Sequence, residues 1–168
     1  MPSKLLFDLS RLDQRRIELS REEIRQFNPQ RYEFEQLDGI FRILPSESLI
    51  VGYRDVRSDE FWVRGHFPGR PILPGVLMVE AAAQLSNLYY ARSFPPPGFL
   101  GFGGLDRVKF RASVRPGERL ILVAKAVRLH PRHSIFETQG LVGDRLVFEA
   151  AITGIVLPDP EETQALHP

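Results

Sequence analysis

One segment of the 168-residue chain restricts the fold more than any other: residues 76–92 read as a helix that is apolar on nearly every side. Its apolar residues are Val76, Leu77, Met78, Val79, Ala81, Ala82, Ala83, Leu85 and Leu88. A helix at a protein surface keeps a polar face, whereas a helix that is apolar all round is buried. We therefore expect this helix to lie in the middle of the protein, covered by the rest of the chain.

The remaining chain is rich in predicted strands, which supply that cover. Apolar or alternating runs bounded by turn residues predict strands at 37–44, 49–56, 99–114, 120–129, 134–142 and 146–157. Gly143-Asp144 has the composition of a hairpin turn between the last two strands. A sheet curved around the helix would bury it, so we expect an α+β architecture.

A short polar helix is predicted near the N-terminus. Ser20 and Glu23 have the spacing of a capping box, and the helix should end near Asn28-Pro29, because the residue before proline avoids helical backbone angles. We divide the chain into an N-terminal extension (1–17), one domain (18–157) and a tail (158–168). The acidic, proline-bearing composition of the tail predicts disorder.

Composition excludes several classes of protein. No apolar run approaches the ~18 residues of a membrane span, and the N-terminus lacks the apolar core of a secretory signal. The absence of cysteine excludes disulfides and thiol chemistry, and the cytoplasm is the default location. A net charge of +1 gives no indication of nucleic-acid binding. Positive charge is instead local, with eight Lys and Arg and one acid between Arg107 and Arg132.

Three polar residues interrupt the apolar helix at a regular spacing. Glu80, Gln84 and Asn87 are four and then three positions apart, which places them on one helix face. A carboxylate on a buried helix has to be paired, hydrogen-bonded or protonated, because burial of a lone charge is very costly. The stripe marks either a narrow face left in water or a functional site.

The loop before the helix holds a histidine on stiff backbone. His66 is bracketed by glycine and proline, at Gly65, Pro68, Gly69, Pro71 and Pro74. Proline fixes φ and glycine allows close approach, so such a loop can hold a catalytic group in a defined geometry. The N–H groups of Gly75 and Val76 open the helix, where they can bind a developing oxyanion. A base, an acid and an oxyanion site suit removal of a proton α to a carbonyl with loss of a β-substituent.

At this point the sequence resembles a known family. The run from Gly65 to Gln84, with Gly-His-Phe-Pro-Gly at its start and Pro-Gly-Val-Leu-Met-Val-Glu before Gln84, is similar to the signature of bacterial β-hydroxyacyl-acyl carrier protein dehydratases of the FabZ type. The similarity covers roughly residues 18–157. It extends to Arg31–Phe34, to Gly104–Arg111 with Pro116–Glu118, and to the last hairpin through Glu149-Ala150.

The resemblance implies a hot-dog fold, in which a curved antiparallel sheet wraps one long helix. It implies a homodimer, with a trimer of dimers as a further option, and interface active sites that take His66 from one subunit and Glu80 from the other. By similarity, His66 removes the C2 proton of a (3R)-hydroxyacyl thioester and Glu80 acts on the 3-hydroxyl, which leaves as water. The Gly75 N–H polarises the carbonyl, and Gln84 orients Glu80 or a water.

The resemblance also implies the substrate's carrier and the pathway. The substrate arrives on the phosphopantetheine arm of acyl carrier protein, so no metal or other cofactor is needed. The product is a trans-2-enoyl thioester of the fatty-acid elongation cycle.

Several positions depart from the family pattern. Gln30 and Glu33 stand where the family usually has histidine and proline, and Ala112-Ser113 lie where it often has Arg-Pro. Two alternatives stay open: the same chemistry in a specialised-lipid or polyene pathway, and a non-catalytic hot-dog subunit that binds acyl carrier protein. A thioesterase on the same fold is a further option, although His66 in its loop fits elimination better than ester hydrolysis.

A basic segment after the helix is a candidate dock for an acidic carrier. Arg107, Lys109 and Arg111 alternate with other residues, so in a regular strand their charges share one face. A solvated sheet face explains the same pattern. Docking of acyl carrier protein is the functional interpretation.

The other candidates carry less weight. His130 and His133 lie in an expected turn without companion ligands, so no metal site is expected there. Phe61 and Trp62 are expected to pack in the protein or to form a wall of an acyl tunnel. Further candidates for lining or gating that tunnel are Tyr89, Tyr90, Phe99 and Phe102.

Overall fold

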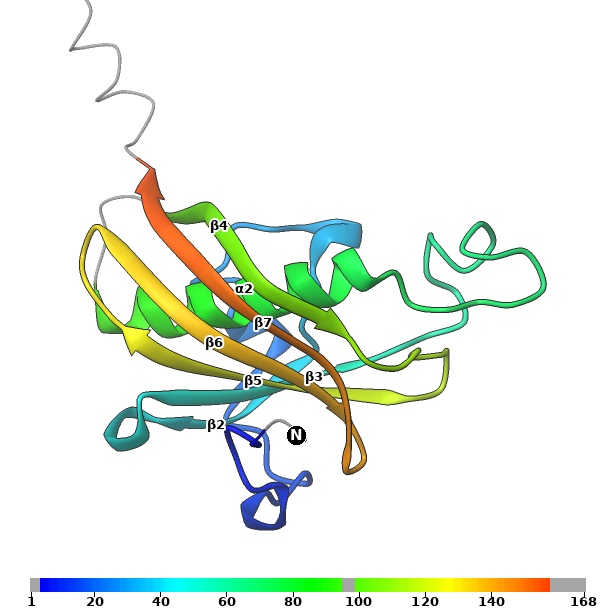
Figure 1. Ribbon diagram of the computed structural model, residues 1–168, viewed down its shortest axis with the longest axis horizontal. Helices are drawn as coiled ribbons and strands as arrows, with labels where there is room; N and C mark the ends of the chain where they lie inside the picture. Colours follow the sequence, from blue (N-terminus) through cyan, green and yellow to red (C-terminus); the bar gives the residue numbers. More distant parts are fainter. Residues whose placement is uncertain (1–3, 95–98, 158–168) are drawn as a thin grey trace, which may run out of the picture.

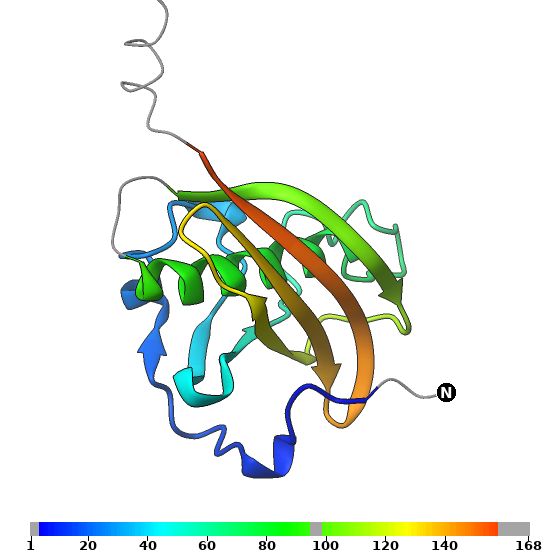
Figure 2. The ribbon, with the colours of Figure 1, turned by 60° about the vertical axis from the view of Figure 1, so that its left-hand side comes forward.

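The long helix α2 (Gly75–Ser93) lies along the concave face of a curved sheet (Figure 1). The computed structural model describes residues 4–94 and 99–157. A second view shows the strands arching over the helix (Figure 2). The predicted break at Pro95–Gly98 and the predicted disorder of the tail at 158–168 lie outside the described residues. No helix in the described ranges is both long and apolar enough to cross a membrane.

Seven strands within the described residues form one antiparallel sheet, in the order β1-β2-β3-β5-β6-β7-β4. Their bounds are β1 (Leu19–Ser20), β2 (Gly39–Leu44), β3 (Leu49–Asp55), β4 (Phe99–Phe110), β5 (Arg119–Arg128), β6 (His133–Val142) and β7 (Arg145–Leu157). A long helix wrapped by such a sheet is the hot-dog arrangement, so the expected α+β fold is confirmed.

The predicted elements agree well with the observed ones, and one difference has a clear cause. Strand β4 ends at Phe110 rather than near residue 114, because the carbonyl of Val114 accepts from the Leu73 N–H at 2.8 Å and draws the chain toward the loop before α2. The predicted turn of the β6–β7 hairpin at Gly143-Asp144 is confirmed, and the positive φ of 59° at Gly143 is easy for glycine.

The N-terminal helix is shorter than predicted. Helix α1 (Arg21–Ile24) has the expected capping box between Ser20 and Glu23, but only a turn follows Ile24 before Asn28. Three short 3₁₀ turns complete the described elements: η1 (Leu9–Arg11), η2 (Tyr32–Phe34) and η3 (Pro45–Glu47).

The main core lies between α2 and the concave face of the sheet. Leu85 and Leu88 of the helix are fully buried there with Leu122, Phe136 and Phe148 of the strands. Each side chain buried in this way stabilises the fold by roughly 1.5–3 kcal/mol. The helix that is apolar all round is therefore the centre of the protein, as expected.

A second core covers the convex face of the sheet, where the N-terminal extension packs. Phe7 is buried there in one cluster with Phe41, Val51 and Tyr53. Gln139 of β6 fixes the segment by accepting from the Leu6 N–H at 2.8 Å and donating to the carbonyl of Lys4 at 3.0 Å. The stretch from Leu6 to Leu12 of the 1–17 extension thus packs on the sheet, whereas residues 13–17 are exposed.

Replacing Phe7 with alanine tests this second core. The Phe7→Ala variant should lose about 3 kcal/mol of unfolding free energy, in the range of other buried phenylalanine truncations. Chemical denaturation measures the loss, and Leu5→Ala, at a side chain 41% exposed on the same segment, is the matched control. Equal, small losses in both variants would mean that the segment does not pack on the sheet in solution.

Candidate active site

The loop between β3 and α2 is held in shape by its own backbone hydrogen bonds. The His66 N–H donates to the carbonyl of Trp62 at 2.8 Å, and the Ile72 N–H donates to the carbonyl of His66 at 2.9 Å. Between these bonds, Phe67 and Arg70 exchange two further bonds, of 3.1 and 2.9 Å. His66 therefore stands on a closed backbone turn rather than on an unsupported loop.

The position of the His66 ring selects one tautomer. Its Nδ1 lies 2.7 Å from the carbonyl oxygen of Ile72. A carbonyl can only accept, so Nδ1 carries the proton and donates, and the lone pair of the neutral ring is on Nε2. The ring also stacks on Phe67, with 4.1 Å between centroids. His66 thus presents a basic nitrogen in a fixed orientation.

His66 shares an open groove of about 500 Å³ with the first turn of α2. Gly75 and Val76 line the groove, and among the described residues no acceptor is found for their N–H groups. The groove therefore combines a base with two free donors at the positive end of a helix dipole.

Gly75 is needed for close packing at the groove. A β-carbon at this position would come within 2.8 Å of the Phe110 ring, which also lines the groove. Glycine therefore allows the aromatic ring to lie directly against the first turn of the helix.

The Glu80 carboxylate is half-buried and held by a neighbouring amide. Gln84, one helical turn later, donates from Nε2 to Glu80 Oε1 at 2.8 Å and to the carbonyl of Phe34 at 2.6 Å. Its Oε1 accepts from the backbone N–H of Gln36 at 3.0 Å. An N–H can only donate, so Gln36 fixes the amide orientation and turns the donor toward Glu80.

The polar stripe of α2 faces protein rather than water. Gln84 and Asn87 are 2% and 6% exposed, so the interpretation that they face solvent is wrong. Asn87 donates to Asn28 Oδ1 at 2.7 Å, and Asn28 donates to the carbonyl of Gln84 at 3.0 Å. The segment around residues 27–36 therefore covers the stripe and supports Glu80.

Within one chain, the predicted site residues fall into two separate groups. The groove brings together His66, Gly75 and Val76, and Glu80 is not among its described lining residues. Glu80 lies with Gln84 on the side of α2 that the 27–36 segment covers. A single chain thus places the His66 ring beside two backbone N–H donors at one site and the Glu80 carboxylate at another.

The basic strand is ion-paired and irregular. The β4–β7 register shifts between Asp106 and Lys109, where Arg107 has a positive φ of 51°, so the expected regular alternation is interrupted. Arg107 lies 3.4 Å from Glu137, while Lys109 and Arg111 lie 3.7 and 2.6 Å from Glu149. Arg107 and Lys109 line a cleft beside Lys4, whereas Arg111 lines the groove of His66.

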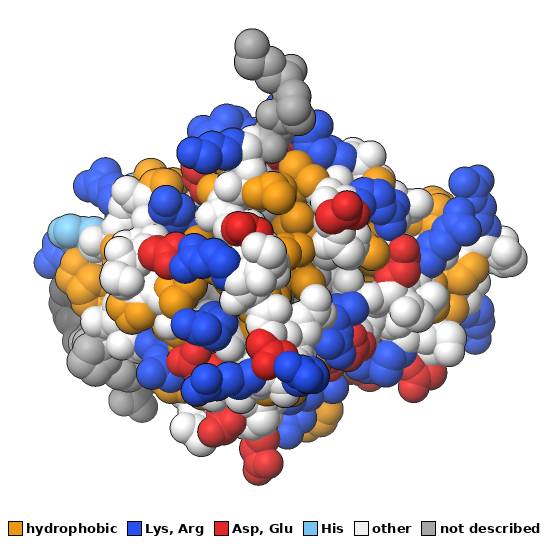
Figure 3. All heavy atoms as spheres, turned by 90° about the horizontal axis from the view of Figure 1, so that it is seen from below, with side chains coloured by type: hydrophobic (Ala, Val, Ile, Leu, Met, Phe, Trp, Pro, Cys, Tyr) orange, Lys and Arg blue, Asp and Glu red, His pale blue; other side chains and the backbone are white. Residues whose placement is uncertain are grey.

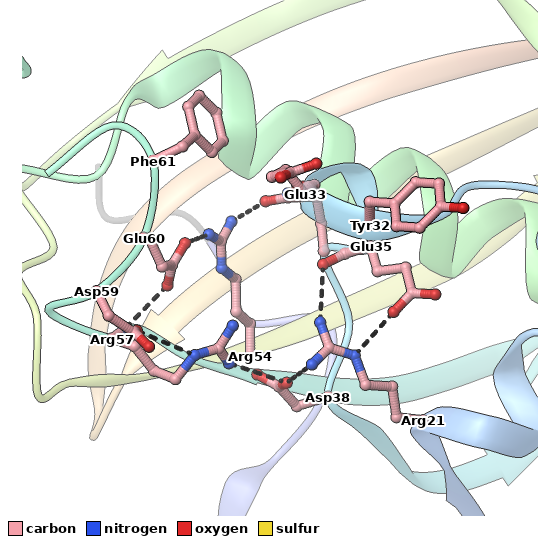
Figure 4. Close-up of a pocket in the computed structure, with 11 residues that line it drawn as sticks. Arg21, Tyr32, Glu33, Glu35, Asp38, Arg54, Arg57, Asp59, Glu60 and Phe61 are labelled. Atoms are coloured by element: carbon pink, nitrogen blue, oxygen red, sulfur yellow. Dashed lines mark hydrogen bonds and ion pairs between the residues drawn. The ribbon is translucent and has the colours of Figure 1, made fainter.

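A cluster of charged residues that the sequence did not single out lies beside the Glu80 support. Arg54 donates to Glu60, as Figure 4 shows, and also to Gln36. These residues line a cavity of about 360 Å³. Burial lowers the pKa of Arg54, and the charge of Glu60 opposes that shift. One feature of the sequence could have indicated this cluster: Arg54 stands at a strand position that the alternation of side chains assigns to the core.

The aromatic candidates divide into packed and exposed residues. Trp62 is buried as expected and donates to Glu60 at 2.8 Å, whereas Phe61 is exposed. Tyr89 and Tyr90 are buried. Phe102 is half-exposed on edge strand β4, and the side chain of Phe99 lies outside the described residues.

His130 lies in the β5–β6 connection, as expected, whereas His133 is the first residue of β6. His130 Nδ1 accepts from the Arg132 N–H at 3.2 Å. Among the described residues, no group of three or more His, Cys, Asp or Glu has the geometry to hold a metal ion.

Comparison with known proteins finds a matching family model and relatives that share one name. Residues 28–151 match the model of the FabA-like domain. The chain is 37% identical over 136 residues to the 3-hydroxyacyl-[acyl-carrier-protein] dehydratase FabZ of Lawsonia intracellularis, covering 79% of this chain and 88% of that protein. It is 36% identical to the FabZ of Enterococcus faecalis over 138 residues, covering 80% and 95%.

Solved structures agree with this fold. A chain of the dehydratase heterocomplex ApeI:P from Xenorhabdus doucetiae superimposes with a TM-score of 0.70 at 12% identity, covering 86% of this chain and 97% of that one. A thioesterase from Pseudomonas aeruginosa gives a TM-score of 0.58 at 17% identity, covering 72% and 81%. At these identities the likeness concerns the fold alone.

The His66 tautomer can be measured directly. Long-range ¹H–¹⁵N NMR of the neutral ring should show the proton on Nδ1 and an unprotonated Nε2, because the Ile72 carbonyl accepts from Nδ1. The His66→Ala variant assigns the signal among the four histidines of the chain. A ring protonated on Nε2 would contradict the geometry described here.

Proposed function

The chain belongs to the FabA-like domain family, and from that membership we propose that it dehydrates (3R)-hydroxyacyl-acyl carrier protein to trans-2-enoyl-acyl carrier protein in fatty-acid elongation. Its relatives over most of its length are named 3-hydroxyacyl-[acyl-carrier-protein] dehydratases. The main structural support is the His66 ring, which the Ile72 carbonyl holds as a base beside free N–H donors.

In the proposed reaction, His66 Nε2 takes the proton from C2 of the substrate. The thioester carbonyl next to C2 gains negative charge as that C–H bond breaks. The N–H of Gly75, with that of Val76 beside it, donates to this oxygen, and the helix dipole adds to the stabilisation. Donors that are already in place need no reorganisation during the reaction.

Glu80 completes the elimination by protonating the 3-hydroxyl. The C3–O bond breaks, water leaves, and the electron pair from the C2–H bond forms the double bond between C2 and C3. Gln84 engages one carboxylate oxygen, Oε1, so Oε2 remains to carry the proton. The proton that His66 gained and the one that Glu80 lost are then restored through solvent.

The separation of His66 and Glu80 within one chain supports a homodimer with composite sites. Each site would take His66 from one subunit and Glu80 from the other. Strand β4 is an edge strand that pairs with β7 alone among the described strands, and it exposes Phe102 and Leu105. An apolar, unpaired edge of this kind is suited to a second copy of the chain. Assembly into a trimer of dimers stays a prediction.

The proposed chemistry uses only side chains and backbone donors. It calls for no metal or redox cofactor, because His66 and Glu80 carry both protons. The substrate is delivered on the phosphopantetheine arm of acyl carrier protein, and the cytoplasmic location expected from the sequence stays a prediction.

We place the docking surface for the acidic carrier at the mouth of the groove. Arg111 lines the groove, and the His66 loop carries Arg64 and Arg70, for which no ion pair is found among the described residues. Figure 3 shows Lys and Arg side chains at the right-hand end of the molecule, as well as over the rest of this face. Arg107 and Lys109, by contrast, line a different cleft.

Hydration of a short trans-2-enoyl thioester, the reverse reaction, tests the proposed activity. The wild type should consume the conjugated thioester at a measurable rate in a spectrophotometric assay. His66→Ala and Glu80→Gln should each lose at least ~100-fold in kcat, as expected for removal of a general acid or base.

The control is His130→Ala, which removes a histidine outside both groups of site residues and should leave the rate unchanged. An inactive wild type would favour a non-catalytic subunit that binds acyl carrier protein. A His66 or Glu80 variant with the full rate would remove that residue from the mechanism.

Charge reversal separates carrier docking from chemistry. Arg64→Glu and Arg111→Glu should raise KM for a carrier-bound substrate about tenfold at low salt, because rim charges act mainly on association. A small thioester should be consumed at the wild-type KM. The same change at Arg107 or Lys109 tests the basic strand, and a smaller effect is expected there. Equal losses on both substrates would rule out docking at the residue concerned.

A further inference from the structure

The least expected side chain of the fold is the buried cation Arg54. It lies on β3 and is 4% exposed. Its guanidinium donates to the Glu60 carboxylate (Figure 4) and to the side-chain oxygen of Gln36. The planar guanidinium has several donors in a rigid arrangement, so it can hold two acceptors at a fixed separation. Arg54 therefore sets the relative position of two segments, that of Gln36 before β3 in the sequence and that of Glu60 after it.

One arm of this contact leads to Glu80. Gln36 accepts from Arg54 through its side-chain Oε1 and donates through its backbone N–H to Gln84 Oε1 at 3.0 Å. Gln84 in turn donates to Glu80 at 2.8 Å. A displacement of Gln36 would release the amide of Gln84 and the carboxylate that this amide holds.

The other arm leads to His66. Glu60 Oε2 accepts from Arg54 and also from the Trp62 indole N–H at 2.8 Å, while Oε1 accepts from the Arg57 N–H at 2.8 Å. The carbonyl of Trp62 accepts from the His66 N–H at 2.8 Å. The loop that carries His66 thus begins beside Glu60, whose carboxylate is held by Arg54.

The other ion pairs around this cavity differ from the Arg54 contacts. Arg57 lies 3.4 Å from Asp38 and 3.5 Å from Asp59, and all three are more exposed than Arg54 and Glu60. Surface pairs of this kind contribute little and are screened by salt. Arg21, at the other end of the cavity, pairs with Glu35 and Asp38 and is itself 35% exposed. Among the described residues, Arg54 is the buried cation that contacts both Gln36 and Glu60.

We propose that Arg54 is a positioning residue, which joins the support of Glu80 to the support of His66 in the same chain. The proposal rests on the proposed function. In a dimer whose sites take His66 and Glu80 from different subunits, each Arg54 supports one half of each of the two active sites.

Kinetics of three variants test this role. In Arg54→Met, kcat for enoyl-thioester hydration should fall about tenfold or more, since small misplacements of catalytic groups are costly, while KM changes about twofold at most. Arg54→Lys keeps the charge and should recover part of kcat. The matched control is Arg119→Met, which removes an arginine that pairs with Asp55 at 2.6 and 2.8 Å on the convex face and for which no contact with Gln36 or Glu60 is found among the described residues. Its kcat should stay within about twofold of the wild type.

A second measurement does not depend on activity. The imidazole ¹H and ¹⁵N signals of His66 should shift in Arg54→Met or Arg54→Lys and stay in place in Arg119→Met. Unchanged His66 signals and kcat in an Arg54 variant that melts earlier would overturn the proposal, leaving Arg54 a structural role. An equal loss of kcat in Arg119→Met would also overturn it. If the wild type is inactive, the proposed function fails, and the His66 signals alone decide for or against positioning.

Discussion

Burial of α2 is the constraint on which the rest of the structure depends. A helix without a continuous polar face has to be covered all round, and one sheet covers only part of its circumference. The segment around residues 27–36 covers the remainder, including the polar stripe. Once buried, the Gln84 amide and the Nδ2 donor of Asn87 need hydrogen-bond partners within the protein, and Asn28, Phe34 and Gln36 provide them. The support of Glu80 is therefore a consequence of covering the helix.

Backbone groups fix the orientation of both proposed catalytic side chains. The Ile72 carbonyl decides which nitrogen of His66 is basic, and the Gln36 N–H decides which end of the Gln84 amide faces Glu80. A backbone carbonyl or N–H has a single hydrogen-bonding role, so each contact permits only one arrangement of its partner. The stiff loop contributes by keeping the Ile72 carbonyl in reach of the ring.

The sequence predicted the elements and the site motif, and it could not predict the contacts that connect them. Period and turn residues located α2 and the strands, and the spacing of Ser20 and Glu23 located the capping box, because these signals lie within a few residues of each other. The contact of Leu6 with Gln139 joins positions 133 apart in the chain, and that of Asn28 with Gln84 joins positions 56 apart. A pattern of neighbouring residues cannot predict a contact between positions so far apart in the sequence. The bulge at Arg107 was missed for a related reason, since alternation assumes a regular pairing register.

Arg54 shows why the missed contacts matter. Along β3, Leu49, Val51 and Tyr53 pack in the convex cluster, while Ile50 faces the main core, so alternation assigns position 54 to the concave side with Ile50. An apolar residue there would avoid the cost of removing a guanidinium and a carboxylate from water, and such replacements are often neutral or stabilising. Stability alone therefore gives no reason for an ion pair at this position. The need for a fixed separation between the segments that hold His66 and Glu80 does give a reason for the ion pair. An apolar contact has no preferred direction, whereas the forked guanidinium donates in two defined directions and so holds both segments in place.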